Sequence, residues 1–316
     1  MKGKTARWLA YPFAYVFVLT TVIYLARFVI STSTLFGMVM FIILAQAVNL
    51  LFGFTGYLPL GLGAFFGVGA YAFAILVSTH NWGILPAVLA ALLFSAGSGA
   101  LVAPLTKLKG PYYAISSLVM QFAMGSMIVN LPEWLASNVT DISLVKIYDP
   151  DLTFVFGLAG LAIAMLIVYY VKNSKYGLAF RAIKDDEQVA AMAGVNVSRY
   201  KVAVSIVAAT LAGYAGIMFG WYYSFLYPES TFDITIPTVA IIIAIFGGLR
   251  TLSGPLLGAA ILYNLQIYLS GILGGSLILL YVPVFAALLI VIVLFLPHGL
   301  IKVLYRYIPR IDRILE

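Results

Sequence analysis

The 316-residue sequence contains no cysteine and only two histidines, and only 9% of its residues are charged. The absence of cysteine excludes a disulfide framework, a thiolate metal site and a catalytic thiol. Neither His80 nor His298 has a second histidine or a carboxylate at metal-ligand spacing, so we expect no metal site. Soluble domains carry about 25% charged residues. A soluble chain of this length could not cover its surface with so few charges, so much of it must face lipid.

Long apolar runs fill most of the chain, in which 63% of the residues are hydrophobic and the mean hydropathy is +1.07. A helix needs about 20 apolar residues to cross the bilayer core. The sequence therefore predicts an all-α integral membrane protein with one transmembrane domain over 1–316 and about ten helices. The predicted spans are 8–29, 35–52, 57–77, 84–105, 112–130, 152–171, 202–223, 236–248, 255–272 and 277–296.

The distribution of basic residues predicts the orientation. With the N-terminus in the cytoplasm and ten spans, all of the 18 Lys and Arg residues except Arg27 and Lys146 fall inside. This is a strong positive-inside bias. We expect a multi-pass protein of the plasma (inner) membrane with both termini cytoplasmic, an external loop at about 131–151 and a cytoplasmic loop at about 172–201. The net charge of +7 then reflects topology, and no nucleic-acid partner is expected.

Glycine clusters mark two regions where helices are expected to break or to pack closely. The predicted helix-break glycines are Gly61, Gly63, Gly247, Gly248 and Gly254. The run 236–248 is short, so it either crosses the membrane or re-enters it. On this topology spans 2–5 and 7–10 begin on opposite sides, as inverted repeats do in many transporters. Because small residues also serve plain helix packing, the repeat is a hypothesis.

Charged residues are almost absent from the predicted spans, whereas neutral polar residues occur there. Carriers coupled to protons or sodium usually keep buried carboxylates in the membrane. We therefore expect the energy for transport to come from elsewhere, such as ATP on a partner protein. The neutral residues either line a translocation path or hold helices together. The candidates for the path are Gln46, Asn49, Thr55, Gln121, Asn264 and Gln266. No paired carboxylates, Ser–Lys pair or His pair suggests an enzyme.

The cytoplasmic loop contains a short predicted helix over 185–194. Asp185 can cap its N-terminus, and Asp186 and Glu187 suit the positive end of the helix dipole. Gly194 supplies a left-handed stop.

One small apolar face follows from the spacing of Val189, Met192 and Ala193 on this helix. Such a short helix is marginal alone in water. We expect it to dock into a partner, with a solvated connector as the alternative.

The loop also carries an ordered pattern of a basic residue, acidic residues, an alanine pair and a glycine. These residues are Arg181, Asp185, Asp186, Glu187, Ala190, Ala191 and Gly194. Further motifs lie at 49–56, 60–71, 108–115, 247–259 and 297–300. Over nearly its whole length the chain resembles the permease subunits of branched-chain amino acid ABC importers, the Liv-type permeases, and the M-type more closely than the H-type.

The resemblance implies a transport subunit that binds no cofactor, with ATP held by two cytoplasmic ATPase subunits. It further implies a second permease subunit, expected to form a heterodimer, and an external solute-binding protein. The loop residues above would form the segment that couples to the ATPase. The implied substrates are branched-chain or related amino acids.

Two departures from the family pattern leave the substrate open. The stretch 137–144 lacks the family's glycines, and Arg250-Thr251 replaces a common Gly-Ser pair. Urea, short amides, sugars or nucleosides are alternatives within the same superfamily. An autonomous channel or secondary carrier, which needs no ATPase, is the alternative of a different class.

Overall fold

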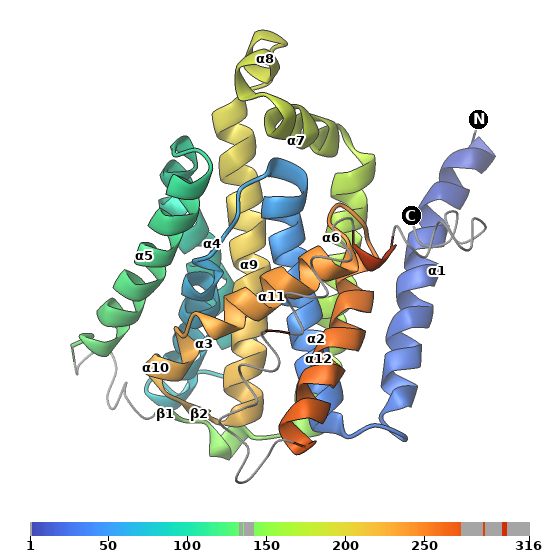
Figure 1. The fold of residues 1–316 in the computed structure, drawn as a ribbon. Coiled ribbons are helices and arrows are strands. Elements are labelled where there is room, and N and C mark those ends of the chain that lie inside the picture. The colour runs from blue at the N-terminus through green and yellow to red at the C-terminus, as the bar shows by residue number, and fades with distance from the viewer. Residues whose placement is uncertain (1, 133–134, 136–141, 273–286, 288–298, 302–316) are drawn as a thin grey trace.

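The computed structural model describes residues 2–132, 135, 142–272, 287 and 299–301, with side chains from residue 13 onward. Within these residues the chain is a bundle of helices with one short two-stranded ribbon (Figure 1). The long helices are α1 (Lys2–Ala26), α2 (Thr32–Val48), α3 (Leu62–Ser78), α4 (Ile84–Val102), α5 (Pro111–Val129), α6 (Pro150–Asn173), α9 (Val197–Tyr223), α11 (Thr235–Gly247) and α12 (Gly254–Ile272). The all-α membrane fold predicted from composition is confirmed.

Apolar helices of spanning length account for most of the described chain. Seven are long and apolar enough to cross a membrane, and two shorter apolar helices, Phe13–Ala26 and Leu62–Ser78, join them. These helices coincide with the first nine predicted spans. The tenth predicted span, 277–296, lies outside the described residues except for residue 287. The predicted inverted repeat includes this span, so it stays a prediction.

The core forms where α3, α4 and α9 cross. Glycine lets these backbones approach closely, because a Cβ on Gly216 of α9 would collide with the carbonyl of Phe66 on α3. Gly69 of α3 faces Gly213 of α9 in the same way. In lipid, where apolar side chains gain little by leaving the solvent, such close backbone packing is a main source of helix association.

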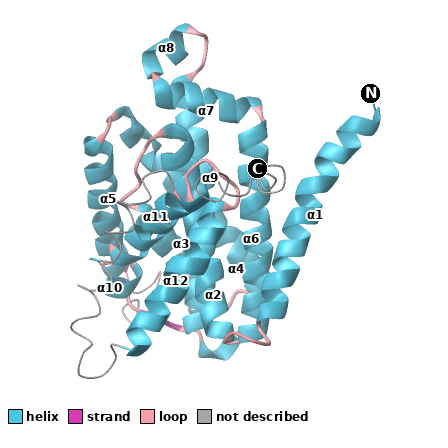
Figure 2. Ribbon diagram, turned by 45° about the vertical axis from the view of Figure 1, so that its right-hand side comes forward, coloured by secondary structure: helices cyan, strands magenta, loops and turns pink. Residues whose placement is uncertain are grey.

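Helix α2 lies inside the bundle, with nearly all of its residues buried (Figure 2). It is apolar on every side, as a fully enclosed helix must be. It continues without a break into η1 (Asn49–Phe54), a six-residue π-helical segment. π-helical turns are rare and occur mostly at functional sites.

The short run predicted at 236–248 is a broken region. Helix α11 has 13 residues, about 20 Å of helix against a hydrocarbon core of about 30 Å. The stretch Pro228–Gly247 reaches spanning length only together with α10 (Pro228–Thr231). A second break, 248–253, separates α11 from α12, and the two helices pack against each other and against α2.

The two ends of the bundle differ in structure. At one end, α7 (Lys175–Asp185) and α8 (Glu187–Met192) project beyond the long helices, and α1 begins on that side (Figures 1 and 2). At the other end, β1 (Ile142–Ser143) pairs antiparallel with β2 (Phe225–Leu226). These ends correspond to the loops predicted at 172–201 and 131–151. Residues 137–141, where family glycines were missing, lie outside the described residues.

Candidate functional site

The projecting loop is built from two short helices joined at Asp186. The backbone of Asp186 is extended, and its Oδ1 accepts hydrogen bonds from the backbone N–H groups of Gln188, at 2.7 Å, and Val189, at 3.1 Å. These bonds cap α8 and hold the pKa of the Asp186 carboxyl below its usual value. The prediction that Asp185 caps this helix is wrong, because Asp185 is the last residue of α7.

Glu187, the first residue of α8, joins the loop to the body of the protein. Its carboxylate lies 2.8 Å from Nζ of Lys201 and 3.9 Å from Nζ of Lys109, and it accepts a hydrogen bond from the hydroxyl of Tyr57. Lys201 belongs to α9, Lys109 precedes α5, and Tyr57 lies between η1 and α3. One carboxylate therefore holds together three parts of the chain that are distant in sequence.

Lys201 is the buried partner in this cluster, with 6% of the residue exposed. Its ammonium also donates to the carbonyl of Thr106, at 2.9 Å, and lies 4.7 Å from the centroid of the Tyr57 ring. Burial alone would raise the pKa of Glu187, but the hydrogen bonds from Lys201 and Tyr57 outweigh it and lower the pKa. Removing one partner of a buried ion pair costs about 3–5 kcal/mol, because the other charge stays buried without compensation.

The opposite side of α8 faces outward. Val189 is 57% exposed and Met192 is 80% exposed, while Ala190 between them is buried. Gly194 follows in the left-handed region at φ +86°, where a side chain is strained. The apolar face predicted from the sequence is thus present on a helix whose other side is fixed by Glu187.

The remaining residues predicted for the loop lie in different surroundings. Asp185 and Ala191 are exposed. Arg181 is half-buried, and its Nε has no acceptor within the described chain.

A cavity of about 420 Å³ lies between the loop and the helix ends beneath it. Tyr57, Lys109, Lys184 and Glu187 are among its lining residues, together with Thr55. Its walls carry both signs of charge and face the projecting end of the bundle.

Two of the predicted path residues hold the break between α11 and α12. Gln46 donates from Nε2 to the carbonyl of Leu252, at 2.8 Å. Asn49 donates from Nδ2 to the carbonyl of Thr251, at 2.9 Å, and accepts from the backbone N–H of Arg250, at 2.6 Å. Both amides are fully buried. Irregular backbone that is buried needs such partners, because an unpaired N–H or C=O group away from water costs free energy.

Gln121 performs a similar role at the bend between α10 and α11. It lies on α5 and donates from Nε2 to the carbonyls of Phe232, at 2.9 Å, and Asp233, at 3.2 Å. Its Oε1 is buried and has no hydrogen-bond partner in the described part of the chain.

The other three polar candidates hold no break, although Nδ2 of Asn264 also lies 3.8 Å from Sδ of Met38 on α2. Thr55 bonds the carbonyl of Leu51 and Asn264 that of Ala260, each within its own helix. Oε1 of Gln266 is buried and unpaired among the described residues. The bonds of Gln46, Asn49 and Gln121 are those of residues that hold helices together. A role in translocation stays a prediction.

A family model described as "Branched-chain amino acid transport system / permease component" matches residues 13–296. The chain belongs to this permease family. It is 26% identical over 264 residues to the high-affinity branched-chain amino acid transport system permease protein LivM of Salmonella typhimurium, a match that covers 74% of this chain and 61% of LivM. It is 25% identical to LivM of Escherichia coli over 70% of this chain and 59% of LivM.

A further relative, LivH of Salmonella typhimurium, is 28% identical over 56% of this chain and 53% of its own length. The permease thus spans about three-fifths of the LivM proteins it matches. No solved structure is significantly similar to it. The predicted resemblance to Liv-type permeases is confirmed.

The glycines predicted at helix breaks lie at helix ends in the permease. Gly61 precedes α3, where a Cβ would collide with the carbonyl of Ser117, and Gly63 faces the amide of Gln121. Gly247 ends α11 and approaches the carbonyl of Gly254, which begins α12.

Gly248 follows α11 with φ +120°, a conformation that favours glycine.

Sequence reasoning missed the residues that hold the projecting loop to the permease body. Lys201 was counted as a loop charge, because its burial depends on the meeting of three distant segments. Tyr57 and Lys109 gave no signal either, apart from their place beside Gly56 and Gly110, which both adopt positive φ.

Proposed function

We propose that the chain is the membrane-spanning permease subunit of an ABC importer, which moves branched-chain or related amino acids with ATP hydrolysed by partner subunits. Membership of the permease family and the names of the LivM and LivH relatives support the transport role and the substrate class. The chain itself acts as a transport subunit and not as an enzyme.

The observation that carries the coupling role is the two-sided character of α8. Val189 and Met192 project from the bundle on one side, while Glu187 is held by Lys201 and Tyr57 on the other. A partner that contacts the apolar side would therefore push on a helix that is braced against the body. A solvated connector would need neither the exposed apolar pair nor the buried ion pair.

In this assignment the projecting end faces the cytoplasm of an inner-membrane protein, and both termini lie there. The partners are cytoplasmic ATPases, a second permease subunit in a heterodimer and an external solute-binding protein. ATP is the cofactor of the ATPases. The basic residues of the projecting loop agree with this orientation.

Co-purification followed by reconstitution tests the proposal. A tagged chain is isolated from native membranes in mild detergent, its partners are identified by mass spectrometry, and leucine uptake into proteoliposomes is measured with and without ATP. We expect an ATP-binding subunit and a second hydrophobic subunit in fixed ratio, with uptake that requires ATP and the solute-binding protein. Uptake by this chain alone without ATP would instead establish a channel or secondary carrier.

Urea and glucose serve as competing solutes in the same assay. ATP-dependent uptake of one of them without leucine uptake would keep the importer assignment and overturn the amino-acid substrate.

A further inference from the structure

The π-helical segment η1 lies between the projecting loop and the broken region of the bundle. It extends α2 by the six residues Asn49–Phe54. Its last turn faces α7, and its first residue faces the loop 248–253. Both contacts are hydrogen bonds between a side chain and a backbone group, so each has a specific geometry.

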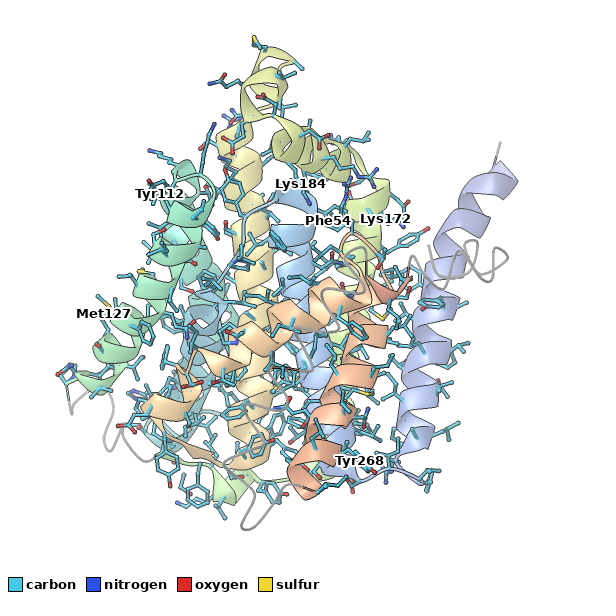
Figure 3. The ribbon with its side chains drawn as sticks, in the orientation of Figure 1. Phe54, Tyr112, Met127, Lys172, Lys184 and Tyr268 are labelled. Carbon is cyan, nitrogen blue, oxygen red and sulfur yellow. The ribbon has the colours of Figure 1, made fainter. Side chains whose placement is uncertain are left out.

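Lys184 makes the contact from α7. Its Nζ donates to the carbonyl of Gly53 at 2.9 Å and lies 5.9 Å from the ring centroid of Phe52. Its aliphatic stem packs on Gly56, where a Cβ would stand 3.3 Å from Cγ of Lys184. Figure 3 shows Lys184 and Phe54 at the same end of the bundle, where α7 passes over the end of α2. Lys184 thus supplies a donor for a terminal helix carbonyl, which would otherwise lack one.

The surroundings of Lys184 are partly dehydrated and carry charges of both signs. Burial lowers the pKa of its ammonium, and the nearby guanidinium of Arg250 lowers it further. Arg250 belongs to the loop between α11 and α12. Lys184 of α7 is therefore close enough to the break to interact electrostatically with Arg250. Asp185 acts in the opposite direction.

Asn49 makes the contact on the other side of η1, through its bonds to Arg250 and Thr251. The same turn is tightly packed, because a Cβ on Gly53 would stand 3.2 Å from the backbone nitrogen of Arg250. Gly53 is therefore in contact with both loops at once: Lys184 binds its carbonyl, and Arg250 lies against its α-carbon.

We propose that Lys184 is a positioning residue that links the α7–α8 loop, through η1, to the break between α11 and α12. A π-helical turn holds one residue more than an α-helical turn. Conversion of η1 to α-helix would rotate Asn49 relative to Gly53 by roughly 100° and shift it by about 1.5 Å. In this proposal η1 changes between the observed π-helical arrangement and an α-helical one, and the bond from Lys184 to the Gly53 carbonyl favours the observed arrangement. This inference rests on the proposed coupling of α8 to an ATPase.

The test uses the absence of native cysteine. Leu249→Cys, a half-buried position at the break, is introduced into the assembled transporter, and its maleimide labelling rate is measured without nucleotide and with ATP plus vanadate. We expect the rate to change with nucleotide when Lys184 is present. Lys184→Met, which keeps the stem and removes the ammonium, should reduce that change about 10-fold, the effect of losing one charged hydrogen bond. Lys184→Arg should restore part of it.

Lys175→Met is the matched control, since Lys175 is an exposed lysine of the same helix. It should leave the nucleotide response unchanged. An unchanged response in Lys184→Met, or no response in the protein that retains Lys184, would overturn the link. In both cases the proposed function would still stand if an ATPase co-purifies with the protein. If no ATPase co-purifies with the parent protein, the proposed function itself is overturned.

Discussion

The two irregular regions of the molecule, the α7–α8 loop and the α11–α12 break, are held by different chemistry. Charge holds the first, where Glu187 binds Lys201 at 2.8 Å. Neutral amides hold the second, where Gln46 and Asn49 bind backbone groups of residues 250–252. The difference follows burial, because an ion pair is tolerable at the projecting end, where water reaches it, whereas neutral donors and acceptors cost less free energy to bury completely.

The two regions can also respond to different influences. The charged cluster at α8 is open to pH and to protein partners, since Glu187 lines a cavity at the projecting end. The amide cluster around Asn49 is fully buried and responds only to movements of the surrounding helices.

Glu187→Gln should have the largest effect. It keeps the shape of the side chain but leaves Lys201 without its counter-charge, so we expect a loss of stability of about 3 kcal/mol. The loss is measured as a lower midpoint of thermal unfolding in detergent. Asp185→Asn, a neighbouring exposed carboxylate, is the control and should change stability by no more than about 0.5 kcal/mol. Equal effects of the two variants would show that the ion pair does not brace α8.

Asn49→Leu should act on the other region. It removes the partners of Arg250 N–H and of the Thr251 carbonyl, which we expect to cost about 2 kcal/mol. Amide hydrogen exchange should accelerate at 249–253 and stay unchanged at 186–193. Asn173→Leu, at an exposed residue that bonds only within α6, is the control. Equally fast exchange in the long helices α3 and α9 would mean that the substitution destabilises the whole bundle and that Asn49 does not hold the break specifically.

Arg250→Gly should have a smaller and opposite effect. Arg250 adopts φ +67°, a left-handed conformation that costs a side-chain-bearing residue about 1 kcal/mol. Glycine removes this strain and retains the backbone bond to Asn49, so thermal stability should rise slightly. Arg250→Ala removes the same charge but keeps a Cβ. A gain of equal size in the alanine variant would assign the effect to charge repulsion with Lys184 and not to backbone strain.

The pH response of the charged cluster should be the smallest effect. The folded pKa of Glu187 lies below its ordinary value of 4.5. Its contribution to stability is therefore complete above pH of about 4.5 and is lost as pH falls through the lowered pKa. Proteolysis of the α7–α8 loop should accelerate over that acidic range in the parent protein. In Glu187→Gln the proteolysis rate of this loop should already be high at neutral pH and should not rise further over the acidic range. If the rate rises there as it does in the parent protein, a group other than Glu187 causes the acid response.

Composition and apolar run length were sufficient to predict the membrane class, nine described helices and the projecting loop. Capping preferences predicted Asp185 as the N-cap of α8, one residue before the observed cap. Two adjacent aspartates fit these preferences equally well, and only the extended backbone of Asp186 shows that it is the cap. The roles of Gln46 and Asn49 were left open between path and packing, since a neutral amide suits both. Lys201 could not be recognised, because its partners Glu187, Tyr57 and Thr106 meet only in the folded chain.

Arg250, where the resemblance implied a glycine, has a structural consequence that the sequence pattern alone had not suggested. The position adopts positive φ, so the replacement of glycine introduces strain at the break and places a cation near Lys184. This difference from the family pattern therefore changes the backbone strain at the break between α11 and α12.

Site-directed cross-linking from Met192 tests the coupling role of α8 most directly. Met192→Cys in the cysteine-free chain is converted with a short photo-reactive maleimide in the complex isolated from membranes, and the adduct is identified by mass spectrometry. The account predicts a cross-link to an ATP-binding subunit that is absent when Leu93→Cys, at an exposed position of the long helix α4, is used instead. An ATP-binding subunit that is present in the complex but cross-links to Leu93→Cys and not to Met192→Cys would contradict it.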